Sequence, residues 1–243
     1  MNHGPLIFLG VLFALATSWY GMVVSPVLQL GSQEPATIES TGGRYPTARP
    51  GLAQQGREIY RANGCNYCHT QQVRAVAEIK EGKLVRYVGS DLGRGWGVRP
   101  SVAEDYLLDK PVMLGTQRIG QDLANIGARQ TNEVWHFMHL YNPQSVSPGS
   151  VMPPYRYLFE KHKIHGAPST NALSLEYQAG LEQGYEIVPK MEARALVAYL
   201  LSLEAGTPLL EAPLPAKPKP QGDTNQSPAV ATTTNAPAPP TAK

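Results

Sequence analysis

The amino-acid sequence predicts a mostly helical protein with one N-terminal transmembrane helix and a single folded domain. Three observations support this class. An apolar run without any charged residue opens the chain, from Leu6 to Val24. Several later segments carry the start signals, the stop signals or the spacing of apolar residues that are typical of helices. The remaining sequence shows no strong alternation of apolar and polar residues, which is the pattern of a half-buried strand.

The apolar run Leu6–Val24 is expected to be a membrane anchor. Its length is close to the ~20 residues that an α-helix needs to cross the hydrocarbon core. Trp19 and Tyr20 lie near its far end, where aromatic rings suit the membrane interface. A cleaved signal peptide is the alternative, with Ala14 and Ala16 near a small-residue cleavage site. The long apolar run and the missing basic n-region favour an uncleaved anchor.

The chain is expected to divide into four parts: an N-terminal transmembrane anchor at 1–30, a linker at 31–51, one domain at 52–205 and a disordered tail at 206–243. The linker is rich in Gly, Pro, Ser and Thr and is expected to hold the domain away from the bilayer. The Pro-, Ala- and Thr-rich tail cannot bury a core. No internal repeat is visible, which predicts one domain and not two.

Three helices are expected within the domain. The segment Leu52–Ala62 predicts a short helix that stops at Asn63, next to a glycine. Thr131 is the expected N-cap of a helix that ends before Asn142, the residue that precedes a proline. Pro189 suits the first turn of a final helix, in which apolar residues recur at helical spacing.

Composition excludes two classes of protein. The chain has 21 Lys and Arg against 19 Asp and Glu, a formal net charge of only +2. A nucleic-acid-binding surface would need a concentrated basic face, so no nucleic-acid partner is expected. With only two cysteines in 243 residues, a disulfide framework is also excluded. The 22 prolines and 23 glycines instead predict long loops between the helices.

Both cysteines lie in one motif, Cys65-Asn66-Tyr67-Cys68-His69. This is C-x-x-C-H, the attachment signature of c-type haem. Thiols at this spacing can reach the two vinyl groups of one porphyrin edge, and His69 then follows as the proximal ligand of the iron. A zinc site would need further ligands, and no third cysteine exists. A thioredoxin-like redox pair would need a βαβ setting, which the sequence lacks.

The sixth iron ligand is expected to be a methionine, because electron-transfer haems often use His/Met ligation. Met138 and Met191 fall within expected helices, where a core role is the better interpretation. Met113, in a loop-like stretch, is a rival candidate. Met152 lies in a Pro-rich loop, whose rigidity leaves little entropy to lose when a ligand is fixed. We therefore expect Met152 to be the ligand.

Several other residues are candidates for the haem surroundings. Histidines that could replace the methionine ligand, although surface or core roles suit them better, are His136, His139, His162 and His165. Apolar and aromatic residues expected to form the wall of the haem pocket are Leu123, Trp135, Tyr141 and Tyr155. Arginines that could pair with haem propionates, as guanidinium matches carboxylate, are Arg74, Arg118 and Arg129. A solvated surface role is an equally good interpretation of each arginine.

Five separated pieces of sequence resemble one family. GREIY at 56–60 precedes GCNYCHTQQVR at 64–74, and GTQRIGQDL follows at 115–123. HLYNP at 139–143 and SVMPPY at 150–155 complete the pattern. The chain thereby resembles the mono-haem cytochrome subunit (subunit II, the O-type subunit) of cbb3-type cytochrome c oxidases. The long insertion between the haem motif and the third piece is also family-like, whereas glutamine replaces the family's usual proline at 121.

The resemblance implies a class I-like cytochrome c domain with long loop insertions, and it too places Met152 as the sixth ligand. It also implies a function. One covalent haem c would relay electrons to a multi-spanning haem–copper catalytic subunit, which reduces dioxygen to water. The expected donor is a di-haem cytochrome c subunit or a soluble cytochrome c. The chain would be a non-catalytic subunit of an oxidoreductase complex in contact with membrane lipid.

Orientation in the membrane follows from the cofactor and not from flanking charges. No Lys or Arg precedes Arg44, so the positive-inside rule gives no direction. Haem c is attached outside the cytoplasm, which predicts a single-pass protein of the bacterial inner membrane with its haem domain on the periplasmic side. Two alternative functions remain open: a free-standing membrane-tethered electron shuttle, and a haem-based gas sensor with a labile sixth ligand.

Overall fold

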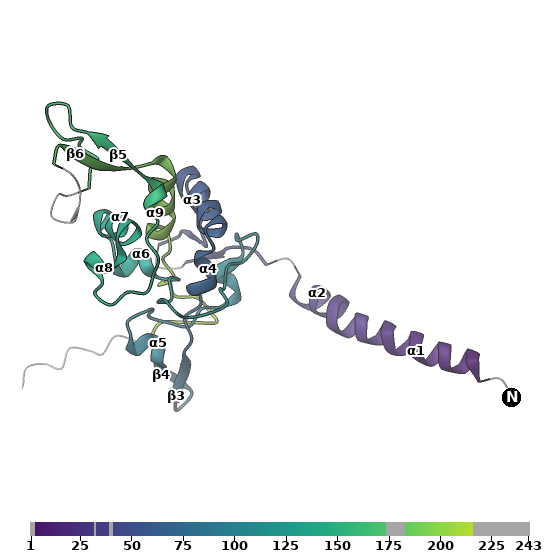
Figure 1. The fold of residues 1–243 in the computed structure, drawn as a ribbon. Helices are drawn as coiled ribbons and strands as arrows, with labels where there is room; N and C mark the ends of the chain where they lie inside the picture. The colour runs from purple at the N-terminus through teal and green to yellow at the C-terminus, as the bar shows by residue number, and fades with distance from the viewer. Residues whose placement is uncertain (1–2, 32, 39–40, 174–182, 216–243) are drawn as a thin grey trace, which may run out of the picture.

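A computed structural model describes residues 3–31, 33–38, 41–173 and 183–215, and shows a long N-terminal helix followed by a mostly helical domain (Figure 1). The expected fold class is confirmed. The main helices of the domain are α3 (Gly51–Ala62), α4 (Cys65–Cys68), α5 (Ser90–Gly93), α6 (Ile126–Arg129), α7 (Glu133–Tyr141), α8 (Pro143–Val146) and α9 (Met191–Leu201). Two short 3-10 turns are η2 (Ala103–Tyr106) and η3 (Arg156–Leu158).

The N-terminal helix is built from α1 (Gly4–Trp19), a π-helical turn η1 (Tyr20–Val24) and α2 (Ser25–Leu30). Its span Gly4–Gln29, 26 residues, is the one helix of the described chain that is long and apolar enough to cross a membrane. At 1.5 Å per residue it extends about 39 Å, more than the ~30 Å hydrocarbon core. Figure 1 shows it standing away from the domain, as a membrane anchor would.

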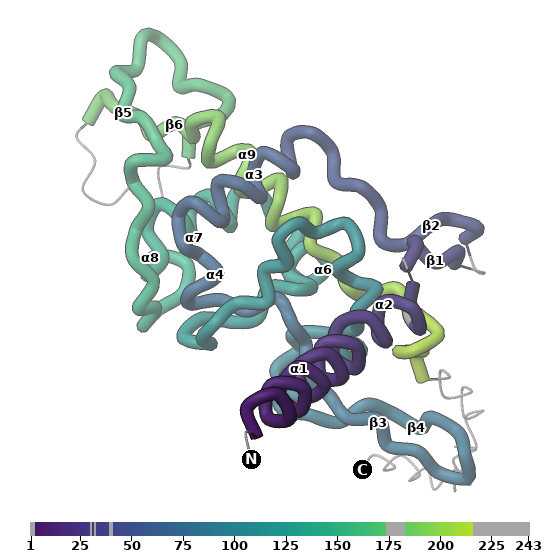
Figure 2. Tube along the Cα trace, turned by 90° about the vertical axis from the view of Figure 1, so that its right-hand side faces the viewer, coloured from purple at the N-terminus to yellow at the C-terminus, as the bar shows by residue number. Residues whose placement is uncertain are grey.

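The domain core is organised by the crossing of α3 and α9, which pack side by side (Figure 2). Gly56 makes this crossing possible, because a Cβ there would lie 1.8 Å from the carbonyl oxygen of Ala195. Beside it, the rings of Tyr60 and Tyr199 lie 5.3 Å apart between centroids. The first and last helices of the domain are thus in direct backbone contact, and both are fixed relative to α4, which follows α3.

Three two-stranded antiparallel sheets interrupt the helices, although no strand was expected from the sequence. They pair β1 (Ala36–Thr37) with β2 (Arg44–Tyr45), β3 (Val76–Lys80) with β4 (Lys83–Val88), and β5 (Phe159–Lys163) with β6 (Tyr185–Pro189). The β3–β4 hairpin turns at Glu81 and Gly82, whose φ angles of 51° and 72° are both positive. This is the backbone that tight hairpin turns require.

The expected Leu52–Ala62 helix is confirmed as α3, but two expected helix starts are wrong. The N-cap of α7 is Asn132 and not Thr131, since the Asn132 side chain accepts a hydrogen bond from the amide of Trp135 at 3.2 Å. Pro189 ends β6, and Lys190 caps α9. Proline has no backbone N–H to donate, but at the end of a strand this donor is not essential. Pro189 can therefore pair with Phe159.

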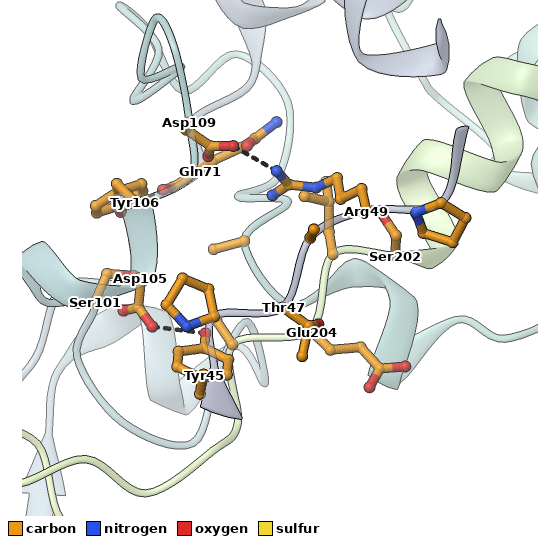
Figure 3. A pocket seen from close by; sticks show the side chains of 16 residues that line it. Tyr45, Thr47, Arg49, Gln71, Ser101, Asp105, Tyr106, Asp109, Ser202 and Glu204 are labelled. Atoms are coloured by element: carbon orange, nitrogen blue, oxygen red, sulfur yellow. Dashed lines mark hydrogen bonds and ion pairs between the residues drawn. The ribbon is translucent and has the colours of Figure 1, made fainter. Parts of the chain in front are cut away.

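The end of the expected linker packs onto the domain. The hydroxyl of Tyr45 donates to Asp105 at 2.7 Å, and Arg49 pairs with Asp109. Between these two contacts lies a polar cavity of about 120 Å³, which Gln71 also lines (Figure 3). From about Tyr45 onward, the segment expected to be a linker therefore packs against the domain.

The start of the expected tail also packs onto the domain. Leu209 and Ala212 are buried, at 5% and 0% exposure. The carbonyl of Thr207 accepts a hydrogen bond from the buried guanidinium of Arg99 at 2.5 Å. Two buried apolar side chains therefore hold this Pro-rich stretch against the domain, and the packed part of the chain extends to residue 212. The rest of the expected tail, 216–243, lies outside the described residues.

Candidate functional site

The C-x-x-C-H motif forms a single helical turn directly after α3. Gly64, with φ 68°, reverses the chain in the left-handed region and starts α4. Cys65 and Cys68 lie at the two ends of this turn and are not joined in a disulfide. The amide of His69 donates to the Cys65 carbonyl at 3.0 Å, after which the backbone becomes extended. The turn thereby presents both thiols and the imidazole from five consecutive residues.

The Cys65 thiol is partly buried beside the core and is protonated in this structure. Burial raises the pKa of the Cys65 thiol to about 12, so it stays protonated at neutral pH. Zinc ligands and disulfide-exchange nucleophiles are thiolates, and low pKa values mark them. Within the described residues, no group of three or more His, Cys, Asp or Glu side chains could hold a metal ion. The described residues therefore offer the motif no further ligands for a zinc site.

The imidazole of His69 is oriented by a residue 52 positions away. Its Nδ1 lies 2.7 Å from the carbonyl oxygen of Gln121. A carbonyl only accepts, so Nδ1 carries the proton and the lone pair is on Nε2, the form that binds a metal. Burial lowers the pKa of His69, which favours the neutral ring. The ring is therefore held in the state that an iron ligand needs.

Two glycines let the 115–123 segment lie against the motif. A Cβ at Gly120 would lie 2.2 Å from Cε1 of His69, and one at Gly115 would lie 2.4 Å from the His69 carbonyl oxygen. The amide of Gly120 donates to the Cys68 carbonyl at 2.9 Å, and that of Thr116 to Asn66 at 3.1 Å. Only glycine permits this approach, which leaves one face of the imidazole covered by backbone.

Asp122 fixes the chain beyond the ligand, a role that sequence reasoning missed. Its side chain is fully buried and accepts three hydrogen bonds. The donors are the hydroxyl of Thr70 at 2.6 Å, the amide of Gln72 at 2.7 Å and the amide of Ala124 at 2.9 Å. These hydrogen bonds fasten residues 70–72, which follow His69, to residues 122–124.

The candidate propionate partners already contact protein groups. Arg118 binds both carboxylate oxygens of Asp91, at 2.6 and 2.7 Å. Arg129 donates to the Gln121 side chain at 2.6 Å and to the carbonyl of Asp122. The Nε atoms of Arg118 and Arg129 are buried and find no acceptor in the described chain. The Arg74 side chain is exposed. Arg118 and Arg129 thus hold together protein segments around His69. The Nε–H of each has no acceptor among the described residues.

Met152 lies in a loop at the edge of the core. It is half-buried and packs against the core cluster, which Cys65 and Tyr155 also contact. The amide of Tyr155 donates to the Leu140 carbonyl at 2.8 Å, so the loop is fixed to the end of α7. Met113 and Met138 are core residues at 4% and 0% exposure, whereas Met191 is 61% exposed.

The other predicted side chains are distributed around the same core. Leu123 is buried, and Tyr141 and Tyr155 pack against the core from its edge. Trp135 stacks on His139, with ring centroids 4.7 Å apart. Nε2 of His136 lies 2.8 Å from the carbonyl of Gln130. His162, which bonds Glu160, and His165 are exposed and remain surface residues.

These residues fit a haem attached at the motif. The thiols are free, the imidazole is neutral with its Nε2 lone pair available, and backbone glycine covers one side of the ring. The mostly helical fold and this site define a membrane-anchored cytochrome c domain with one haem motif.

The comparison with family models identifies the family. The model for the mono-haem subunit of cytochrome c oxidase, FixO, matches residues 6–186, and the chain belongs to this family. It is a mono-haem electron-transfer subunit of a cbb3-type cytochrome c oxidase. No curated protein sequence matches the chain. The match covers the anchor, the haem motif, the Met152 loop and most of the domain.

Proposed function

We propose that this chain carries one haem c, bound by thioethers to Cys65 and Cys68 and ligated by His69 and Met152, and that it passes single electrons to the haem–copper subunit of its complex. The observation that carries the proposal is the hydrogen bond from His69 Nδ1 to the Gln121 carbonyl, because it leaves the Nε2 lone pair free to bind a metal. In each thioether, the S–H adds across one vinyl double bond, so no oxidant is needed.

The bound haem supplies a one-electron iron couple, and the protein supplies binding, orientation and tuning. Gly120 and Asp122 hold His69 in one orientation, and the hydrogen bond from Tyr155 to Leu140 anchors the Met152 loop to α7. With His69 and Met152 as its protein ligands, the iron would have no open position for dioxygen. Oxygen reduction would therefore occur in the catalytic subunit, with a di-haem subunit or a soluble cytochrome c as the electron donor.

Copurification tests the relay against its two alternatives. A tag on this chain is expected to recover the haem–copper subunit from solubilised membranes, and carbon monoxide is expected to leave the spectrum of this chain's reduced haem unchanged. A free shuttle would come away without that subunit. A gas sensor would show a shifted spectrum, because carbon monoxide would replace a labile sixth ligand.

The same proposal places the domain outside the cytoplasm. The helix Gly4–Gln29 would anchor it in the inner membrane, with residues from about Tyr45 onward on the periplasmic side. Protease added to intact spheroplasts is expected to remove the haem-staining domain. A domain that survives in intact spheroplasts, but is digested once the membrane is broken, would place it on the inner side.

A further inference from the structure

The carbonyl of Gln121 orients His69, and its own direction needs a restraint. The oxygen lies 2.7 Å from Nδ1 of His69, and a rotation of its peptide group would lengthen or bend that hydrogen bond. Glutamine leaves the backbone φ angle free, whereas proline, the usual residue of the family at position 121, locks it. In this chain, contacts around Gln121 therefore have to supply the restraint.

Arg129 makes contacts on both sides of this carbonyl. One nitrogen of its guanidinium donates to the side-chain oxygen of Gln121 at 2.6 Å, and another donates to the carbonyl of Asp122. The two acceptors belong to the residue whose carbonyl meets His69 and to the next residue along the chain. A planar guanidinium presents its N–H groups in a fixed fork, so it holds both acceptors at a set spacing. The peptide group between them is thereby restrained.

The arginine itself stands on a fixed helix. It is the last residue of α6, which is in backbone contact with the end of α9. A Cβ at Gly127 would lie 2.1 Å from the carbonyl oxygen of Leu201, and the Gly127 amide donates to the Leu203 carbonyl at 2.9 Å. Because α9 also packs on α3, which leads into the haem motif, Arg129 links the core of the domain to the acceptor that orients His69.

We propose that Arg129 is a positioning residue, which keeps the Gln121 carbonyl at hydrogen-bonding distance from His69. This inference rests on the proposed function, because it requires a haem iron bound to Nε2 of His69. A hydrogen bond from Nδ1 to a fixed acceptor makes the imidazole a more basic ligand. A more basic ligand favours the ferric iron, which carries the greater positive charge. The contacts of Arg129 therefore lower the reduction potential of the haem.

The sign of this effect separates positioning from pairing with a haem propionate. A cation beside the haem favours the reduced form, which carries one positive charge fewer, and so raises the potential. Arg129→Lys keeps the charge but loses the fork, and Gln121→Ala removes one acceptor without any change of charge. In both variants we expect the electron equilibrium with a fixed reference couple to shift about threefold toward the reduced haem, about 28 mV for one electron.

The test is a redox titration of haem c in the purified complex. Gln121→Pro is the matched partner of Gln121→Ala, because it also loses the side-chain oxygen but fixes the backbone itself. It should stay within about 1.5-fold of the parent equilibrium. Arg86→Lys changes an exposed arginine that pairs with Glu78 on the β3–β4 hairpin, and should leave the equilibrium unchanged. Haem content and the far-red ferric band of His/Met ligation should be those of the parent in all four variants.

Three results would overturn the proposal. They are a shift below about 1.5-fold in Arg129→Lys, a shift of that variant toward the oxidised haem, and equal shifts in Gln121→Pro and Gln121→Ala. If Gln121→Pro does not load haem, agreement in sign and size between Arg129→Lys and Gln121→Ala decides the matter. Absence of low-spin haem c from the parent complex would instead contradict the proposed function itself.

Discussion

Replacing Cys65 and Cys68 together with alanine is expected to abolish covalently bound haem in this chain. The reason is that the sequence contains no other cysteine, so no thioether can form elsewhere. His69 would keep its place, because its orientation comes from the Gln121 carbonyl and not from the thiols. Any haem still held would therefore be bound by coordination alone and would be released when the protein is denatured.

Haem staining on a denaturing gel and the absorption of the haem extract measure this result. Each single alanine variant should keep one thioether and still stain, with a visible spectrum shifted toward that of haem with one free vinyl group. The complex that contains the double variant should lose oxygen consumption from the physiological donor, while its haem–copper centre still binds carbon monoxide. A staining band in the double variant would contradict attachment through these thiols.

The motif and the anchor could be predicted because each is a local pattern. Five consecutive residues define the haem motif, and the uncharged Leu6–Val24 run defines the apolar helix. The support of the site could not be predicted in this way. Gln121 and Asp122 meet the motif from about fifty residues away, and only the tertiary structure shows that the Gln121 backbone, and not its side chain, orients His69.

The β3–β4 hairpin carried a signal that was missed. Glu81-Gly82 is a plausible two-residue turn, and β-branched residues flank it on both sides. Alternation was hidden because most residues of the hairpin are exposed and charged side chains stand among the apolar ones, as at Glu78 and Arg86. The packed stretch up to Ala212 was missed for a different reason, since two buried side chains are too few to produce a periodic pattern.

Met152→Ala is expected to give the second large effect, which is loss of the sixth iron ligand. Alanine has no donor atom, so the far-red ferric band of His/Met ligation should disappear. The reduction potential should fall, because a methionine ligand raises it, and we expect a shift of more than tenfold in the electron equilibrium, about 59 mV or more. The reduced haem should now bind carbon monoxide at the vacated position.

The same measurement on two other methionines makes the assignment decisive. Met191→Ala removes a side chain that is 61% exposed and should change neither the band nor the potential. Met113→Ala empties a core position at 4% exposure, and should cost about 2–5 kcal/mol of stability while the band remains. If the band instead survives in Met152→Ala and is lost in Met113→Ala, the ligand is Met113. The Met152 loop, which a hydrogen bond fixes to α7, would then serve only the packing of half-buried Met152 against the core.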